Sequence, residues 1–406
     1  MLLGYVGFAS FRFMPSVDHE HSPAEFQKDP KTKLDGSIKM FNTGVSSLSN
    51  STSSLERAVT ELNDLAQHTA PNPFDSKIQN PFESKIDKID PPVVTPVVPS
   101  PSTGNTKYWL IIGIPTVPRR NDIDYLTTTL QTLLEQLPAD KADPFFGKVG
   151  VFVMNNKPGD HKVYDRVKEY YKTGEGAGGR AAYLHFLDNP GVVKDPAPHL
   201  PDPDDLHNPT NRPGRGVRKQ TCDLVTLIEM ARDISDYYLF MEDDFAVCPH
   251  FTRALHYVIE KANTVQPDWL SLRVSYGMNG IAMKSSDIPM LSAYLREHTA
   301  RLPPDLLWQE FVAGNNPEAK KSIGRRKIMV YKYNLLDHIG TISSFAIRPN
   351  RPKWPGCYDS MADVWSLQKI ETFDARQCPS DDMSPCNFNT PRPAWAGKDN
   401  LIKFHK

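Results

Sequence analysis

The sequence predicts an α/β domain in which helices flank a mostly parallel sheet. Between Tyr108 and Phe345, apolar runs of strand length alternate with segments whose apolar residues recur at helical spacing. The run Tyr237–Met241 is apolar throughout, which is typical of a strand buried on both faces inside a parallel sheet. Three carboxylates, Glu242–Asp244, follow this run directly. Because ligands bind at the carboxyl ends of such strands, the sequence predicts the functional site there.

The first half of the domain alternates between strands and helices. The predicted strands are Tyr108–Ile114, Val149–Met154 and Tyr183–Leu187, and the predicted helices are Tyr125–Leu137, Asp165–Tyr171 and Val217–Asp233. In the first helix, leucines recur at intervals of three and four residues, which gives it one apolar face. The glycine-rich segment Gly174–Gly179 lacks the preceding strand and the following Lys-Ser/Thr of a phosphate-binding loop, so we expect a flexible loop. The long Pro- and Asp-rich segment Asp188–Gly216 predicts a functional lid or a disordered loop.

The second half of the domain continues the alternation after Tyr237–Met241. The predicted helices are Phe251–Ala262, Ile288–Tyr294 and Leu306–Val312, and the predicted strands are Trp269–Val274 and Lys327–Leu335, with a turn at Gly277–Gly280. Strands that alternate with helices in this way indicate βαβ units, which is why the predicted sheet is mostly parallel.

The segments outside this domain carry few signals of regular structure. Residues 1–14 are apolar but shorter than the ~20 residues that a membrane span needs, so they are either the remnant of a signal anchor or a plain apolar N-terminus. Residues 15–106 are rich in Ser and Pro and contain two near-copies of an Asn-Pro-Phe segment, which predicts a largely disordered stem or linker. The repeats could alternatively be peptide ligands. Residues 346–406 form a Pro- and Cys-rich extension, which leaves residues 107–345 as the folded domain.

Charge and cysteine content bear on partners and compartment. Lys plus Arg number 47 and Asp plus Glu number 48, so the charge pattern gives no support for a nucleic-acid partner. None of the five cysteines forms a CxxC pair, so we expect no zinc site. Cys357, Cys378 and Cys386 lie in the loop-rich extension, where a disulfide would help in an oxidising compartment, and the odd count leaves at least one thiol unpaired.

The acidic triplet Glu242–Asp244 predicts a metal site. Three adjacent carboxylates repel one another, and burying them without partners would cost several kcal/mol. Mg²⁺ and Mn²⁺ prefer oxygen ligands and often bridge a carboxylate to a substrate phosphate. The alternative interpretation is a solvated acidic turn after a core strand.

Basic groups are predicted at the same edge of the sheet. The loop after the first strand contributes Thr116, Arg119 and Arg120, and the helix before the acidic strand contributes Arg215, Arg218, Lys219, Gln220 and Asp223. Cations, a helix N-terminus and a metal site together suit a diphosphate, although any one of these basic residues alone would be explained as a solvated surface charge.

These motifs resemble the catalytic domain of the α-1,3-mannosyl-glycoprotein 4-β-N-acetylglucosaminyltransferases. The matching segments are Gly113–Arg120, Val217–Leu224 and Tyr238–Asp244, with looser matches at Pro304–Leu307 and Leu335–Ser344. The resemblance implies a GT-A type fold and an inverting transfer of N-acetylglucosamine from UDP-N-acetylglucosamine to a mannose of an N-glycan. It also implies dependence on Mn²⁺ (or Mg²⁺) and a Golgi membrane protein whose catalytic domain is lumenal.

The resemblance further implies roles for single residues. Metal and nucleotide contacts fall to Glu242, Asp243 and Asp244, with Asp244 as the direct metal ligand. Further nucleotide contacts fall to Thr116, Arg119, Lys219 and Asp223. His338 is either a third metal ligand or a structural histidine.

The catalytic base is the point at which the sequence departs from the family pattern. Arg273 and Gln309 stand where the family carries acidic residues. An inverting transfer needs a carboxylate within hydrogen-bond reach of the acceptor hydroxyl. We expect Glu310 to be this base, with Asp305 as the second candidate, and the alternative for Glu310 is a solvated helix residue.

The sequence therefore predicts a metal-dependent inverting glycosyltransferase that uses UDP-N-acetylglucosamine and a glycan acceptor. Two alternatives stay open. One is a related transferase with another sugar donor or acceptor. The other is a carbohydrate- or nucleotide-binding protein without catalysis, which the departures at Arg273 and Gln309 would explain. A nucleotide hydrolase is disfavoured because no activated-water motif is visible.

Overall fold

The computed structural model describes residues 107–200, 202, 212–341, 354–361 and 381–385, and the fold is that of these residues. Its main sheet contains β1 (Tyr108–Thr116), β2 (Val149–Asn155), β3 (Leu184–Asp188), β4 (Ser235–Phe240), β6 (Ser271–Arg273), β7 (Ile281–Lys284), β8 (Ile328–Tyr331) and β10 (Met383–Ser384). The strand order is β10-β8-β6-β7-β4-β1-β2-β3. Only β7 and β10 run antiparallel to their neighbours in this sheet. The predicted mostly parallel α/β sheet is confirmed.

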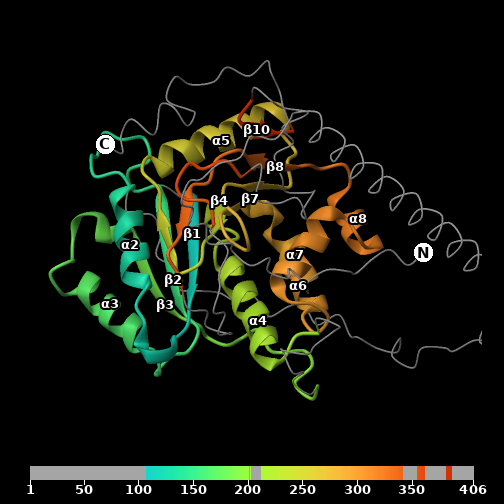
Figure 1. Cartoon of the computed structure of the whole chain (residues 1–406), viewed down its shortest axis with the longest axis horizontal. Coiled ribbons are helices and arrows are strands. Elements are labelled where there is room, and N and C mark those ends of the chain that lie inside the picture. The colour runs from blue at the N-terminus through green and yellow to red at the C-terminus, as the bar shows by residue number, and fades with distance from the viewer. Residues whose placement is uncertain (1–106, 201, 203–211, 342–353, 362–380, 386–406) are drawn as a thin grey trace, which may run out of the picture. The chain divides into compact units, whose positions relative to one another are not determined.

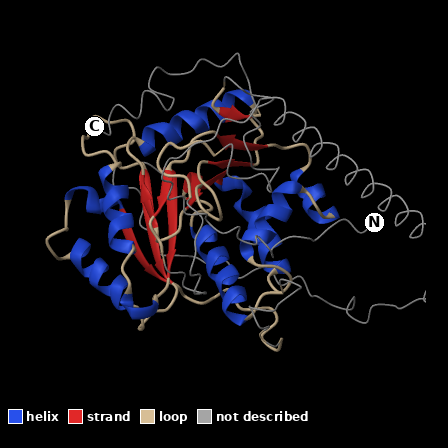
Figure 2. Cartoon of the chain, viewed as in Figure 1, coloured by secondary structure: helices blue, strands red, loops and turns tan. Residues whose placement is uncertain are grey.

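Helices cover both faces of the sheet (Figures 1 and 2). They are α2 (Leu126–Glu135), α3 (Lys162–Lys172), α4 (Arg215–Met230), α5 (Phe251–Val265), α6 (Ile288–His298), α7 (Pro304–Ala313) and α8 (Pro317–Ile323). One buried cluster joins Leu130 of α2 and Leu255 of α5 to Ile112 of β1. A second cluster joins Leu227 of α4 to Ile111, the neighbouring residue of β1. Since successive strand residues point to opposite faces, Ile111 and Ile112 belong to two separate cores.

The predicted strands and helices of the domain are present, with ends shifted by a few residues. The sequence did not predict β7, β10, α8 or β5 (Phe245–Val247), which pairs with β9 (Leu336–His338) in a small second sheet. These strands have only two to four residues, too few to show a period, and depend on partners distant in the chain. Gly174–Gly179 contains turns, and none of its residues is among those that line the cavity described below.

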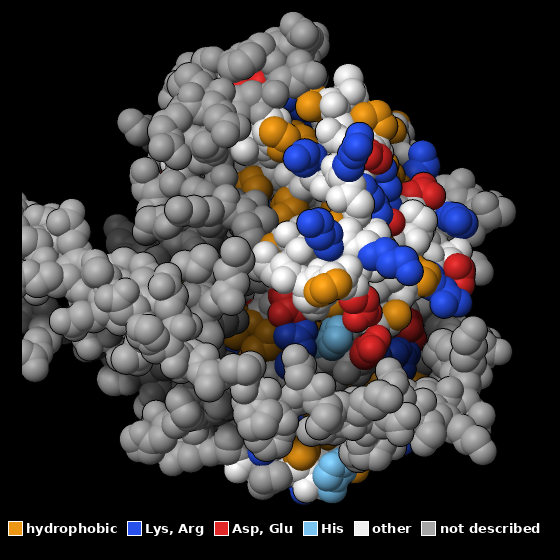
Figure 3. All heavy atoms as spheres, turned by 90° about the vertical axis from the view of Figure 1, so that its right-hand side faces the viewer, with side chains coloured by type: hydrophobic (Ala, Val, Ile, Leu, Met, Phe, Trp, Pro, Cys, Tyr) orange, Lys and Arg blue, Asp and Glu red, His pale blue; other side chains and the backbone are white. Residues whose placement is uncertain are grey.

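The C-terminal extension contributes to this fold. Its strand β10 pairs with β8 at the edge of the main sheet. Beside it, Asp381 and Asp382 form ion pairs with the buried Lys261 of α5. The domain therefore continues beyond the predicted boundary at residue 345. In the coloured part of the face shown in Figure 3, both basic and acidic side chains are exposed.

Residues 1–14 and 15–106 lie outside the described part of the chain, so the signal-anchor remnant and the stem stay predictions. Among the described helices, none is both long and apolar enough to cross a membrane.

A disulfide joins Cys248, just before α5, to Cys357 in the extension. The sequence left the pairing open; Cys357 pairs across 109 residues, and Cys378 and Cys386 lie outside the described residues. Cys222 is a free, buried thiol. Disulfides persist in oxidising compartments, which is the environment that the cysteine content suggested.

Removing the disulfide is expected to destabilise the domain, because it closes a long loop of the unfolded chain. We expect the double variant Cys248→Ser/Cys357→Ser to lose about 2–4 kcal/mol of unfolding free energy in urea denaturation. Cys222→Ala is the matched control: it keeps the disulfide, so reductant should destabilise it as it does the wild type, whereas the double variant should not respond to reductant. Equal stability of the double variant and the wild type would contradict the prediction.

Candidate active site

A cavity of about 660 Å³ opens at the carboxyl ends of β1 and β4. Eight of the ten predicted site residues line it: Thr116, Arg119, Lys219, Asp223, Glu242, Asp243, Asp244 and His338. The wall also includes Asn156 at the end of β2 and Met278 of the turn before β7. The structure therefore brings these eight predicted residues together at one edge of the sheet.

Asp243 is held by three side chains from other elements. Arg119 donates to its Oδ1 at 2.5 Å, and Thr116 donates to its Oδ2 at 2.6 Å. Thr129 of α2 donates to its backbone carbonyl at 2.9 Å. The residue is only 6% exposed, so the direction of its carboxylate is fixed by these contacts. Arg119 also lies 3.2 Å from Asp244, which joins the two acids through one guanidinium.

Asp244 and His338 are brought together by the small β5–β9 sheet. The pairing of Phe245 with His338 places the His338 Nε2 atom 3.4 Å from the Asp244 carboxylate. The backbone N–H groups of Ile339 and Gly340 donate to the Asp244 carbonyl at 3.0 and 3.2 Å. A Cβ atom at position 340 would lie 2.1 Å from Asp244 Oδ2, so any other residue there would displace this carboxylate.

Glu242 completes the acidic group, and its backbone N–H donates to Asn279 at 3.0 Å. Burial, together with the charges of Asp244 and Asp243, raises the pKa of Glu242 well above its usual value. Burial also raises the pKa of Asp243, although Arg119 opposes this shift. The Asp244 carboxylate and the His338 imidazole lie close enough to share one divalent cation, and Glu242 lines the same cavity.

The raised pKa of Glu242 predicts a pH-dependent stability of the metal-free protein. A raised folded-state pKa means that the folded state loses stability as pH rises from the usual value of 4.5 through the folded value. We therefore expect Glu242→Gln to be more stable than the wild type at pH 7, by an amount on the order of 1 kcal/mol or more, and equal to it near pH 4. Thermal melts in a chelator at both values of pH check this. A variant that is less stable at pH 7 would contradict it.

Lys219 and Asp223 form the opposite wall, on the first turns of α4. Lys219 Nζ donates to Asp223 at 2.6 Å and to the carbonyl of Asn156 at 2.9 Å. Burial raises the pKa of Asp223, while the hydrogen bond from Lys219 lowers it. Gly216 of the same helix also lines the cavity, so the α4 N-terminus faces a region that would favour anionic groups. Arg218 instead pairs with Asp195 at 2.9 Å and is fully buried, which is a structural role.

The structure separates the two candidates for the catalytic base. Glu310, our first candidate, is not among the described residues that line the cavity, and it accepts hydrogen bonds from Arg301 at 2.8 Å and Asn316 at 2.9 Å. The hydrogen bond from Arg301 lowers the pKa of Glu310, which makes it a weaker base. Asp305 is exposed in the first turn of α7 beside Pro304, which lines the cavity, and its charge contributes to the raised pKa of Glu242. This geometry favours Asp305 over Glu310.

Arg273 and Gln309, where acidic residues were expected from the family, also lie outside the cavity wall. Arg273 is 2% exposed and donates to the carbonyls of Ser275 and Gly277 at 3.3 and 2.6 Å. Its guanidinium lies 4.7 Å from the ring centre of Trp308. These hydrogen bonds of Arg273 stabilise the turn that contains Met278 and Asn279.

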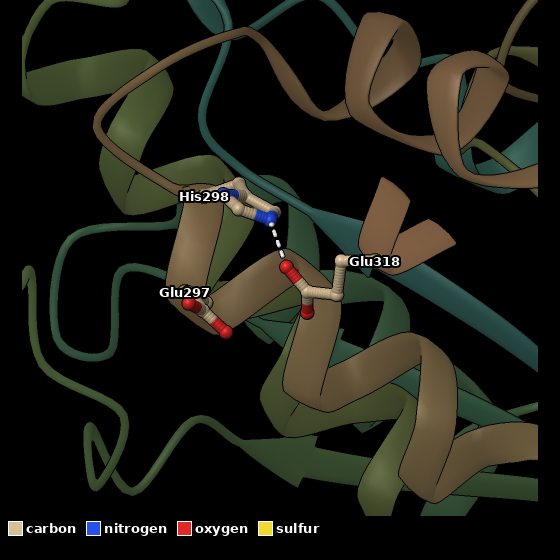
Figure 4. Close-up of side chains that lie close together, drawn as sticks. All are labelled: Glu297, His298 and Glu318. Atoms are coloured by element: carbon tan, nitrogen blue, oxygen red, sulfur yellow. Dashed lines mark hydrogen bonds and ion pairs between the residues drawn. The ribbon is translucent and has the colours of Figure 1, made fainter. Parts of the chain in front are cut away.

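A separate group of possible ligands lies between α6 and α8. Figure 4 shows Glu297 and His298 near Glu318, and their ligand atoms lie within 4.8 Å of one another. His298 Nε2 is 2.9 Å from Glu318, and both glutamates are exposed. We interpret this group as a surface ion pair between helices.

His161 is a residue of the site that sequence reasoning missed. Its ring lies 2.9 Å from Thr116 Oγ1, 45 residues away in the chain, and no local pattern marks it. Asn156 was missed as well, although its place directly after a strand was a usable signal.

Comparison with known proteins finds several relatives that are named as 4-β-N-acetylglucosaminyltransferases. The chain is 26% identical over 251 residues to mouse (Mus musculus) α-1,3-mannosyl-glycoprotein 4-β-N-acetylglucosaminyltransferase C, covering 61% of this chain and 48% of that protein. It is 28% identical over 256 residues to the human (Homo sapiens) B enzyme, covering 60% of this chain and 44% of that protein. The chain thus spans about half the length of the curated relatives that it matches.

Among solved structures, the crystal structure of S. aureus TarS matches with a TM-score of 0.33 at 12% identity, over 58% of this chain and 37% of that one. The galactosyltransferase LgtC matches with a TM-score of 0.30 at 13% identity, over 49% and 69%.

A family model also matches the chain. The MGAT4 conserved region matches residues 81–353, which is more than half of the chain and includes all ten predicted site residues. The chain therefore belongs to the MGAT4 family, that of the α-1,3-mannosyl-glycoprotein 4-β-N-acetylglucosaminyltransferases.

Proposed function

We propose that the protein is a metal-dependent inverting glycosyltransferase that moves N-acetylglucosamine from UDP-N-acetylglucosamine to a mannose of a glycoprotein N-glycan. The observation that carries this proposal is the meeting of Arg119, Asp244 and His338, from three separate elements, in one cavity at the α4 N-terminus. The names of the relatives support the transferred sugar and the acceptor class.

The donor diphosphate would be bound where positive groups converge. Asp244, His338 and Glu242 would hold Mn²⁺ or Mg²⁺, which when bound stabilises charge on a leaving diphosphate as a Lewis acid. Arg119 lies between Asp243 and Asp244 and can donate to a phosphate oxygen. Asp243 and the Lys219–Asp223 pair would orient the nucleotide, and the α4 N-terminus favours its negative charge.

Asp305 would act as the base of the transfer. It removes the proton of the acceptor hydroxyl, and the resulting oxygen attacks the anomeric carbon on the face opposite UDP. The new glycosidic bond forms as the bond to UDP breaks, and the electron pair of that bond leaves with the β-phosphate oxygen. Attack from the opposite face inverts the anomeric configuration and gives the β-linked product.

We also propose a Golgi membrane protein with a lumenal catalytic domain. The Cys248–Cys357 disulfide supports an oxidising, lumenal environment for the described part of the chain.

The test is a transfer screen with the full chain. UDP-N-acetylglucosamine, UDP-N-acetylgalactosamine and UDP-glucose are each offered with a mannose-terminated N-glycan, in Mn²⁺ and in EDTA. We expect UDP release and glycan elongation with UDP-N-acetylglucosamine in Mn²⁺ alone. Elongation with another donor only would favour the related transferase. UDP binding by calorimetry without turnover of any donor would favour a binding protein and overturn the proposal.

A further inference from the structure

The first turn of α3 is linked to the acidic group by an unbroken series of hydrogen bonds. The Tyr164 backbone N–H donates to Nδ1 of His161, the residue that caps α3. His161 Nε2 lies 2.9 Å from Thr116 Oγ1, and Thr116 donates to Asp243 at 2.6 Å. His161 is 3% exposed and is not among the described residues that line the cavity.

The first hydrogen bond of this series determines which atom donates and which accepts in the others. A backbone N–H can only donate, so Nδ1 of His161 must accept and must carry no proton. A neutral imidazole then carries its proton on Nε2 and donates it to Thr116. The Thr116 hydroxyl, having accepted, directs its own proton to Asp243. The Asp243 oxygen therefore accepts the last hydrogen bond of the series.

We infer that His161 is a positioning residue that, through Thr116, holds the Asp243 carboxylate in the orientation needed for the donor nucleotide. This inference rests on the proposed function for its consequence, since Asp243 is assigned there to the nucleotide. Arg119 donates to one oxygen of Asp243 and the series from His161 ends on the other, so the two together fix the direction of the carboxylate.

Two substitutions separate this role from helix capping. His161→Asn keeps an excellent cap for α3 but is too short to donate to Thr116. His161→Gln extends an amide N–H to about the position of Nε2 but is a poor cap. If His161 only caps α3, His161→Gln is the more damaging change. If it acts through Thr116, His161→Asn is the more damaging change for the donor.

The first test measures the affinity for UDP in Mn²⁺ and the KM for the sugar donor. We expect His161→Asn to raise both the Kd for UDP and this KM by about tenfold, with an unchanged melting temperature. We expect His161→Gln to have a lower melting temperature but to retain most of the affinity. Thr116→Val should weaken binding similarly, and the double variant Thr116→Val/His161→Asn should show no further loss. Affinity that falls with melting temperature across the set would overturn the inference.

The second test requires no sugar donor. In the protein labelled with ¹⁵N-histidine, the signal that disappears in His161→Asn should show a protonated Nε2 and an unprotonated Nδ1. A protonated Nδ1 would overturn the inference even if transfer is established. A protein that turns over no donor but shows the Nε2-protonated form would refute the proposed function and leave this arrangement in place.

Discussion

Replacing Asp244 by Asn is expected to abolish metal-dependent transfer, with kcat/KM falling by about 10³-fold or more. The substitution keeps the shape of the side chain but removes the charge that, in the proposed function, would hold a divalent cation beside His338. Without that cation, the charge that develops on the leaving diphosphate loses its main stabilisation. Release of UDP from UDP-N-acetylglucosamine over a series of Mn²⁺ concentrations measures the effect.

The matched control is Asp236→Asn, the same change at an exposed position near the start of β4. It should leave activity and stability unchanged. Asp244→Asn should also remain folded in the absence of metal, because it removes one of three crowded negative charges and leaves Arg119 paired with Asp243. An Asp244→Asn protein that is folded and within tenfold of wild-type activity would show that this carboxylate does not hold the metal.

The acidic triplet and its surroundings were predictable because each feature is local in the sequence. The carboxylates Glu242–Asp244 follow a fully apolar strand, so they are expected at the edge of the sheet. Parallel strands bring the loops that follow them to the same edge. Arg119 and Lys219 could therefore be assigned to the site without knowledge of any contact.

Features that depend on distant pairing could not be predicted in this way. His338 reaches Asp244 only because two three-residue strands pair across 94 residues. His161 reaches Thr116 because the loop after β2 folds back to the end of β1. Glu310 has the residue type and lies on the helix expected of the base. Its carboxylate, however, forms an ion pair with Arg301 of the preceding loop. Local periodicity contains none of these pairings.

The departures from the family pattern do not remove an acid from the cavity wall. Arg273 is buried against Trp308 and its neighbouring carbonyls, and Gln309 follows Trp308 on α7. Neither lines the cavity in the described part of the chain. The structural role of Arg273 therefore weakens the main sequence argument for a protein without catalysis.

The largest effect on stability is expected at Lys261, far from the cavity. Its side chain is 3% exposed and forms ion pairs with Asp381 and, at 2.8 Å, with Asp382, which also accepts a hydrogen bond from Tyr257 at 2.9 Å. Lys261→Met would leave two buried carboxylates without their cation. We expect a loss of about 3–5 kcal/mol in the free energy of unfolding at pH 7.

The pH dependence of this loss distinguishes charge from packing. Burial would raise the pKa of Asp381, but the hydrogen bond from Lys261 lowers it below its usual value of 3.8. A lowered folded-state pKa gives stability that is present above that value and is lost as pH falls through the folded pKa. The deficit of Lys261→Met in urea denaturation should therefore shrink between pH 7 and pH 3. The control is Lys168→Met, which breaks a more exposed pair with Asp188 at 3.7 Å and should cost less than about 1 kcal/mol. A similar small loss for Lys261→Met would mean that β10 and its two aspartates contribute little to the fold, and a large loss makes residues 381–385 an integral part of the domain.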